Sequence, residues 1–130
     1  MTEGQELILI VDDEADIRDA VIRSNKLAHR SFKEAENGLE ALTLLKEYPF
    51  NVIVCDITMP KMSGPQLLVI AREMGLETPF IFISGHAGSD VLSQIKDTGK
   101  VKFLEKTSIR GLSQTITQVI SEETAQKSTR

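Results

Sequence analysis

The sequence predicts an α/β domain in which a five-stranded parallel β-sheet carries helices on both faces. Several short segments are continuously apolar and rich in β-branched residues. This pattern is typical of strands that are covered on both faces of a parallel sheet. Segments with helical spacing of apolar residues lie between them, so that strands and helices alternate along the chain. A β-α order repeated five times predicts parallel strands joined by right-handed crossovers.

The expected strands are short. Three of them are apolar throughout, and the last one has Val101, Phe103 and Leu104 as its apolar residues. The second strand alternates between apolar and polar residues, which predicts a position at the edge of the sheet. In chain order, the expected strands are residues 7–11, 31–36, 52–55, 80–83 and 100–106.

The expected helices follow from apolar stripes with a period of about 3.6 residues. Turn signals agree with their limits: Asn37-Gly38 and Tyr48-Pro49 are typical of turns, and Ser63 is a suitable N-cap with Pro65 in the first turn. The first stripe includes Leu27 and Ala28. In chain order, the apolar stripes lie at residues 17–28, 67–74 and 109–120, and two shorter helices are expected at residues 38–47 and 89–97.

The composition is that of one ordinary globular domain. The chain has 130 residues, of which 41% are hydrophobic and 26% are charged. Its apolar runs are about five residues long, whereas a membrane-spanning helix needs about twenty. The net charge of −4 disfavours direct contact with nucleic acid. One cysteine and no secretory signal lead us to expect a cytoplasmic protein. We expect residues 7–122 to form the domain and residues 1–6 and 123–130 to be flexible.

Chemically active side chains follow the expected strands. The acidic run Asp12-Asp13-Glu14 comes after the first strand, Asp56 after the third, Ser84 after the fourth and Lys106 at the end of the last. Ligands of open α/β sheets bind beyond the carboxyl ends of the strands. The sequence therefore predicts one site at this edge that contains carboxylates, a hydroxyl and an ammonium group.

The two adjacent acids indicate a metal ion rather than a nucleotide cradle. Phosphate-binding folds place glycines or hydroxyls after the first strand, and two carboxylates there would repel a phosphate. A hard divalent cation reverses this effect, and carboxylate oxygens suit Mg²⁺. Either Asp12 or Asp13 alone could cap a helix, and Asp56 and Ser84 could each be turn residues. Cys55 is expected to be an inert buried residue.

These residues resemble the receiver domains of bacterial two-component response regulators over residues 7–121. The separations of 43 residues from Asp13 to Asp56, 28 to Ser84 and 22 to Lys106 make the combination specific. The segments that carry the resemblance are IVDDE at 10–14, ENGLEAL at 36–42, VCDITMP at 54–60, MSG at 62–64, ISG at 83–85 and FLEK at 103–106. The resemblance implies a flavodoxin-like (βα)5 fold with strand order 2-1-3-4-5.

The resemblance also implies a role for each site residue. Asp56 is expected to be the phosphoacceptor. The expected Mg²⁺ ligands are Asp13, Asp56, the backbone carbonyl of Thr58 and, through water, Asp12. Lys106 and Ser84 are expected to bind the phosphoryl oxygens, and Phe103 to rotate inward when Ser84 shifts. Thr58 and His86 stand at positions that set how long the phosphoryl group lasts.

Four features depart from the family pattern. Thr107 follows Lys106 where the family usually has a proline in a cis peptide bond, and a cis bond before threonine would cost about 2.5–4 kcal/mol. Ser84 replaces a more frequent threonine, and His86 replaces a residue that is often small. Residues 97–102 are more basic than usual, which predicts a positive patch.

The resemblance implies that the partners are a sensor histidine kinase or a histidine phosphotransfer protein and a downstream target or output domain. Whether phosphorylation drives homodimerisation stays open, as does whether the receiver stands alone. Two alternatives also stay open. One is a binding module that keeps the fold and signals without phosphate. The other is a Mg²⁺-dependent phosphatase, which typically needs a second acid two residues after the nucleophile, where this chain has Thr58.

Overall fold

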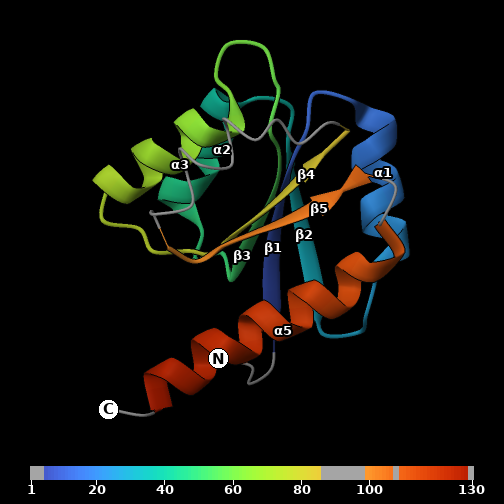
Figure 1. Cartoon of the computed structure of the whole chain (residues 1–130), viewed down its shortest axis with the longest axis vertical. Helices are drawn as coiled ribbons and strands as arrows, with labels where there is room; N and C mark the ends of the chain where they lie inside the picture. Colours follow the sequence, from blue (N-terminus) through green and yellow to red (C-terminus); the bar gives the residue numbers. More distant parts are fainter. Residues whose placement is uncertain (1–4, 86–98, 107–108, 129–130) are drawn as a thin grey trace.

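A computed structural model describes residues 5–85, 99–106 and 109–128 of the chain. The strands form one parallel sheet with the order β2-β1-β3-β4-β5, as predicted (Figure 1). Each strand begins and ends within one residue of its predicted range, and β2 lies at an edge of the sheet. The strands are β1 (Glu6–Val11), β2 (Arg30–Ala35), β3 (Val52–Asp56), β4 (Phe80–Ser84) and β5 (Val101–Glu105).

Helices cover both faces of the sheet (Figure 1). They are α1 (Ala15–Ser24), α2 (Gly38–Glu47), α3 (Gly64–Glu73) and α5 (Ile109–Ser128). The helix predicted at residues 89–97 lies outside the described residues. Among the described helices, none is both long enough and apolar enough to cross a lipid bilayer.

Alternate residues of the strands point to the two faces and build two hydrophobic cores. On one face, Leu9 and Ile53 pack with residues of α2 and α3, such as Leu67. On the other face, Ile8 and Val54 pack with residues of α1 and α5. Because both faces are covered, β3 and β4 are buried along their whole length, which explains their continuously apolar sequences.

The predicted extent of the first helix was wrong at its end. α1 ends at Ser24, and Leu27, which was predicted to lie on its apolar face, is 44% exposed. The reason is Asn25, whose side-chain amide donates a 2.6 Å hydrogen bond to the carbonyl of Val21. An asparagine that binds the backbone in this way competes with helix continuation.

The last helix is longer than the apolar stripe predicted. α5 continues to Ser128, so it includes residues that were expected to form a flexible tail. Glu123, in this added part, forms a 3.1 Å ion pair with Lys100. At the other end of the chain, Glu6 belongs to β1 and forms a 2.8 Å ion pair with the buried Arg30. Both contacts join residues far apart in the sequence.

Candidate functional site

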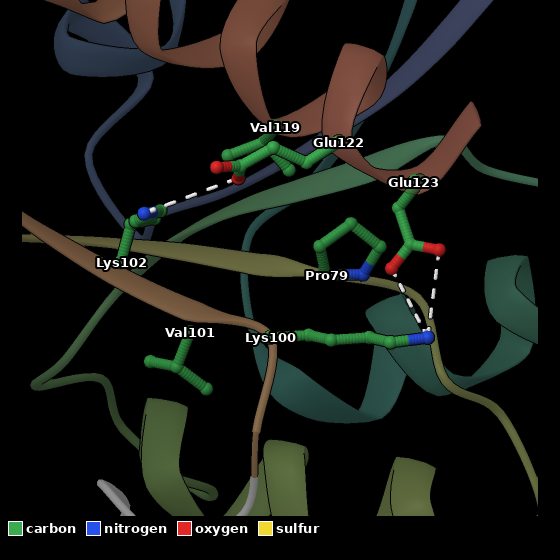
Figure 2. A pocket seen from close by; sticks show the side chains of 7 residues that line it. All are labelled: Pro79, Lys100, Val101, Lys102, Val119, Glu122 and Glu123. Atoms are coloured by element: carbon green, nitrogen blue, oxygen red, sulfur yellow. Dashed lines mark hydrogen bonds and ion pairs between the residues drawn. The ribbon is translucent and has the colours of Figure 1, made fainter. Parts of the chain in front are cut away.

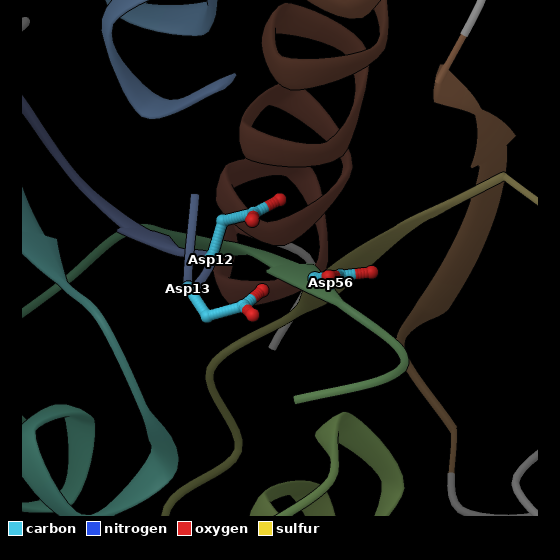
Figure 3. A group of neighbouring side chains, drawn as sticks. All are labelled: Asp12, Asp13 and Asp56. Carbon is cyan, nitrogen blue, oxygen red and sulfur yellow. The ribbon is translucent and has the colours of Figure 1, made fainter. Parts of the chain in front are cut away.

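The carboxyl ends of β1 and β3 bring three aspartates together. The register of the two strands places Val11 opposite Cys55. Asp12, the first residue after β1, therefore lies beside Asp56, the last residue of β3. Asp13 is the next residue after Asp12. Each aspartate offers a carboxylate oxygen, and these three atoms lie within 4.8 Å of one another (Figure 3). The acids that the sequence predicted at the strand ends form one cluster.

The three aspartates differ in their exposure. The Asp12 and Asp56 residues are buried, with exposed fractions of 0% and 5%, whereas Asp13 is exposed. Oδ1 of Asp12 accepts a 2.9 Å hydrogen bond from the backbone N–H of Glu14. Oδ2 of Asp12 is buried and has no hydrogen-bond partner among the described residues. A carboxylate oxygen in this situation favours a positive charge beside it.

Lys106 supplies part of that charge. It follows β5, and its Nζ lies 3.4 Å from Oδ2 of Asp56 and 3.5 Å from Oδ2 of Asp12. The contact with Asp56 has the geometry of a hydrogen bond, whereas the contact with Asp12 is an ion pair only. One ammonium group thus faces two buried carboxylates. The site keeps an excess of negative charge.

The pKa values of these groups reflect burial and mutual charge. Burial, followed by the nearby Asp56 carboxylate, raises the pKa of Asp12 from 3.8 to about 6, although the hydrogen bond from Glu14 opposes this shift. Burial also raises the pKa of Asp56, although Lys106 lowers it in part. Burial by itself would lower the pKa of Lys106, but the two carboxylates raise it above its ordinary value. Bringing these carboxylates together costs free energy, which a bound cation would offset.

The donor set fits Mg²⁺ better than a soft metal. Three carboxylates converge, and the buried Oδ2 of Asp12 has no hydrogen bond within the described part of the chain. Hard cations take oxygen ligands, and Mg²⁺ keeps several waters in its coordination shell. The exposure of Asp13 leaves the cluster open to solvent on one side. The residues present therefore fit a magnesium ion.

The other predicted residues that are described lie near the cluster or pack behind it. Ser84 is buried at the end of β4, beside β3, where Asp56 is paired with Ile83. Thr58 is exposed and lies two residues after Asp56, and its backbone lowers the pKa of the Asp56 carboxyl in part. Phe103 is half-buried and stacks on Phe82, with ring centroids 5.7 Å apart. His86 and Thr107 lie outside the described residues.

Cys55 packs inside β3 and is not part of the site. It is fully buried, and its thiol donates a 3.2 Å hydrogen bond to the backbone carbonyl of Asp56. Burial raises the pKa of the thiol well above its ordinary value. A thiol of this kind is neither a nucleophile nor a metal ligand, as the sequence predicted.

Two residues close to the cluster have roles that sequence reasoning missed. A Cβ atom placed on Gly64, at the start of α3, would lie 2.4 Å from the backbone carbonyl oxygen of Asp56. Only glycine fits this close approach. Arg18 of α1 donates a 2.6 Å hydrogen bond to the backbone carbonyl of Asp12. The sequence carries a signal for Gly64 through its place in the MSG segment, but none for the contact of Arg18.

A groove of about 470 Å³ lies between the start of β5 and the C-terminal half of α5, at the amino ends of the strands and away from the aspartates. In it, Lys100 is paired with Glu123 at 3.1 Å and Lys102 with Glu122 at 4.0 Å (Figure 2). These pairs correct the prediction of a positive patch at residues 97–102 for the two lysines that are described. The groove holds balanced charges and no cluster of acids.

Known proteins share this fold. Residues 8–117 match the family model of the response regulator receiver domain. The chain is 30% identical over 123 residues to the sensor kinase CckA of Brucella abortus (strain 2308), in a match that covers 92% of this chain and 13% of the kinase. It spans between 13% and 50% of the length of the first curated relatives that it matches.

Solved structures agree with this match. The receiver domain of the Francisella response regulator 1452 is 26% identical, with a TM-score of 0.83 over 92% of this chain and 99% of that chain. The receiver domain of the histidine kinase CKI1 from Arabidopsis thaliana, complexed with Mg²⁺ and BeF3⁻, is 27% identical, with a TM-score of 0.75 over 89% and 90% of the two chains. The family match spans the sheet and the three aspartates, and the chain belongs to the response regulator receiver domains of two-component systems.

Proposed function

We propose that this domain accepts a phosphoryl group on Asp56 in a Mg²⁺-dependent reaction and that phosphorylation changes its contacts with other proteins. The observation that carries the proposal is the cluster of Asp12, Asp13 and Asp56, with Lys106 Nζ 3.4 Å from Asp56. The donor is a phosphohistidine of a sensor histidine kinase or of a phosphotransfer protein. The domain is a phosphoacceptor that signals rather than an enzyme that turns over a separate substrate.

The main obstacle to this reaction is charge. The Asp56 carboxylate is the nucleophile, and one of its oxygens forms a bond to phosphorus while the bond from phosphorus to the imidazole nitrogen breaks. Both the carboxylate and the phosphoryl group are anionic, so phosphoryl transfer depends on positioning and charge neutralisation. Lys106, 3.4 Å from Asp56, supplies part of the positive charge that the reaction needs.

Mg²⁺, when bound, would supply further positive charge that offsets the repulsion between the two anions. Asp13 and Asp56 would bind it directly, together with the backbone carbonyl of Thr58. The buried Asp12 would act through a coordinated water, as the resemblance to receiver domains implies. The Arabidopsis receiver domain is complexed with Mg²⁺ and BeF3⁻, which supports a magnesium site next to an anion in this chain.

Phosphorylation would act as a switch through Ser84, Lys106 and Phe103. The hydroxyl of Ser84 and the ammonium of Lys106 would form charge-assisted hydrogen bonds with the new phosphoryl oxygens. The aromatic ring of Phe103 would rotate inward as Ser84 moves. A shift of the active form from 1% to 99% requires about 5.5 kcal/mol of differential stabilisation, and these hydrogen bonds supply part of it.

The lifetime of the aspartyl phosphate would depend on residues beside the acceptor. The domain would catalyse its own dephosphorylation by water. Thr58 is exposed two residues after Asp56, where its side chain can affect the approach of water. His86, which lies outside the described residues, follows Ser84 closely in the sequence and would act in the same way.

The partners follow from the role of a phosphoacceptor. One relative of this chain is a sensor kinase, and another is the C4-dicarboxylate transport transcriptional regulatory protein DctR of Rhodobacter capsulatus. We therefore propose a kinase or phosphotransfer protein upstream and a protein target or output domain downstream, all in the cytoplasm. No direct contact with nucleic acid is needed.

Treatment with a small acyl phosphate and Mg²⁺, followed by intact mass spectrometry, tests the proposal. We expect the mass of the protein to increase by one phosphoryl group. Asp56→Asn removes the nucleophile and should abolish the increase, as should a chelator of Mg²⁺. Asp19→Asn, a change of an exposed acid on α1, is the matched control and should be modified like the wild type.

Absence of the phosphoryl group under these conditions would contradict the proposal and favour the module that signals without phosphate. Modification that persists in Asp56→Asn would also contradict it, because another residue would then be the acceptor. The phosphatase alternative has no support from the site, since Thr58 stands where such an enzyme needs a second acid.

A further inference from the structure

Arg18 of α1 joins the loop that carries two of the aspartates to the neighbouring strand β2. Its Nη1 donates a 2.6 Å hydrogen bond to the backbone carbonyl of Asp12, and its Nε donates a 2.9 Å hydrogen bond to Oε1 of Glu34. The Arg18 side chain is only 15% exposed. Its guanidinium group therefore links α1, the end of β1 and β2 at one point.

The loop has few other restraints. The backbone N–H of Asp12 donates to the carbonyl of Ala35, and after this bond the chain leaves β1 and its sheet partner. Glu14, the N-cap residue of α1, makes no side-chain capping hydrogen bond. Besides Arg18, the described side-chain hydrogen bond that orders this turn is the one from the N–H of Glu14 to Oδ1 of Asp12.

We propose that Arg18 is a positioning residue that holds the Asp12-Asp13 turn in the geometry that binds Mg²⁺. The inference rests on the proposed function, because it requires Mg²⁺ at the aspartate cluster. Mg²⁺ demands nearly ideal octahedral geometry. Groups that orient metal ligands from behind typically change metal affinity by about 10–100-fold when they are removed. Without Arg18, the carbonyl of Asp12 would lose its hydrogen bond and the turn would gain freedom.

The positive charge of Arg18, taken alone, predicts that removing Arg18 would have the opposite effect on Mg²⁺ affinity. A cation next to a cation site repels the metal ion, so its removal would tighten Mg²⁺ binding if charge alone mattered. Glu34 offsets this charge at 2.9 Å. The two explanations therefore differ in sign for Arg18→Ala. They also differ for Arg18→Lys, which keeps the charge but cannot form both hydrogen bonds in the same geometry.

Isothermal titration calorimetry with MgCl2 on the intact chain tests the proposal. We expect Arg18→Ala to weaken Mg²⁺ binding about tenfold or more, and Arg18→Lys to weaken it as well. Arg23→Ala is the matched control, because Arg23 lies on the same helix, has a 73% exposed side chain and pairs only with Asp19 at 3.0 Å in the described structure. It should bind Mg²⁺ as the wild type does or slightly more tightly.

A kinetic measurement separates positioning from a general loss of stability. In the acyl phosphate reaction, Arg18→Lys should raise the Mg²⁺ concentration needed for half-maximal rate and leave the rate at saturating Mg²⁺ close to that of the wild type. If Arg18→Ala does not fold, as judged by circular dichroism, Arg18→Lys decides the question.

Mg²⁺ binding by both Arg18 variants that equals or exceeds that of the wild type would overturn the inference and leave the proposed function intact. A wild-type protein that binds no Mg²⁺ would instead overturn the proposed function, and the inference with it.

Discussion

Asp12 shows how the local environment of one residue shapes the site. Its side chain is completely buried, its Oδ2 has no hydrogen bond among the described residues, and its pKa is raised to about 6, mainly by burial. Lys106 is close to this carboxylate at 3.5 Å but is also shared with Asp56 at 3.4 Å. In the metal-free protein, the ionised form of Asp12 therefore opposes folding. When a cation is bound, the same negative charge attracts it and stabilises the folded protein.

We expect Asp12→Asn to stabilise the metal-free protein by about 1–2 kcal/mol at neutral pH, because it removes a buried charge and keeps the acceptor for the N–H of Glu14. Urea unfolding in the presence of a chelator measures this change. The same variant should lose most of the stabilisation that Mg²⁺ gives the wild type. Asp19→Asn is the control and should change neither quantity. A destabilised Asp12→Asn protein would count against the account.

The sequence predicted which residues form the cluster but not what holds them. Asp12, Asp13 and Asp56 could be found because parallel strands place their carboxyl ends at one edge of the sheet. The contact of Arg18 with the carbonyl of Asp12 could not be found in this way, because it depends on how α1 packs against the end of β1. A basic residue on a half-exposed helix gives no sequence signal for such a contact.

At the scale of elements, the start of α3 is fixed against the end of β3. Gly64 donates its backbone N–H to the carbonyl of Ile57 at 2.9 Å, and a Cβ on Gly64 would also lie 2.8 Å from the ring of Phe82. Ser63 caps the helix in a reciprocal capping box with Gln66. The cap and the close approach together hold the loop that follows Asp56 near the site.

We expect Gly64→Ala to destabilise the protein by about 2–3 kcal/mol, because the added methyl group meets backbone and ring atoms that cannot move aside cheaply. Gly111→Ala is the matched control. Gly111 lies on the exposed side of α5 with nothing within 4 Å of an added Cβ, so alanine should stabilise the helix by about 0.5–1 kcal/mol. Chemical denaturation of both variants measures the difference, and equal effects would contradict the packing argument.

The strands could be predicted from sequence almost to the residue, whereas two helix ends could not. Buried parallel strands have continuous apolar runs, so their limits are visible without tertiary information. The end of α1 is decided by a hydrogen bond from Asn25 to Val21. The last turns of α5 carry no apolar stripe, and Glu123 there pairs with Lys100 from the start of β5. Such contacts between distant residues leave no periodic pattern.

At the scale of the whole molecule, the carboxyl ends and the amino ends of the strands have different roles. The acid cluster and Lys106 lie at the carboxyl ends of the strands. At the amino ends of the strands, the buried Arg30 pairs with Glu6 at 2.8 Å. It also donates hydrogen bonds to the hydroxyls of Ser113 and Thr117 on α5. Unfavourable charge is thus concentrated among the aspartates at the carboxyl ends, and Arg30 links β1, β2 and α5 at the amino ends.

The raised pKa of Asp12 predicts how the free energy of unfolding depends on pH. Because the folded-state pKa of Asp12 is raised from 3.8 to about 6, the folded protein binds a proton that the unfolded chain has already released in this interval. The contribution of Asp12 to the free energy of unfolding should therefore fall as pH rises between these values and stay low above them. The raised pKa of Asp56 acts in the same direction.

The difference in unfolding free energy between Asp12→Asn and the wild type, measured without metal, isolates this contribution. It should grow with pH across the interval and then level off. Saturating Mg²⁺ should raise the melting temperature of the wild type more at about pH 7 than at about pH 4.5, since Mg²⁺ competes with protons for the carboxylates. A pH-independent difference would contradict the assignment of the raised pKa to Asp12.

The central claim is that the three aspartates, of which the buried Asp12 and Asp56 have raised pKa values, together bind one magnesium ion. The most direct test is a Mg²⁺ titration of the chain followed by the NMR signals of the backbone amides. We predict saturable shifts with one-site behaviour at Asp12, Asp13 and the residues around Asp56, strong weakening in Asp13→Asn, and no weakening in Asp19→Asn. No saturable shift at these residues, or shifts spread over the exposed acids of the surface, would contradict the account.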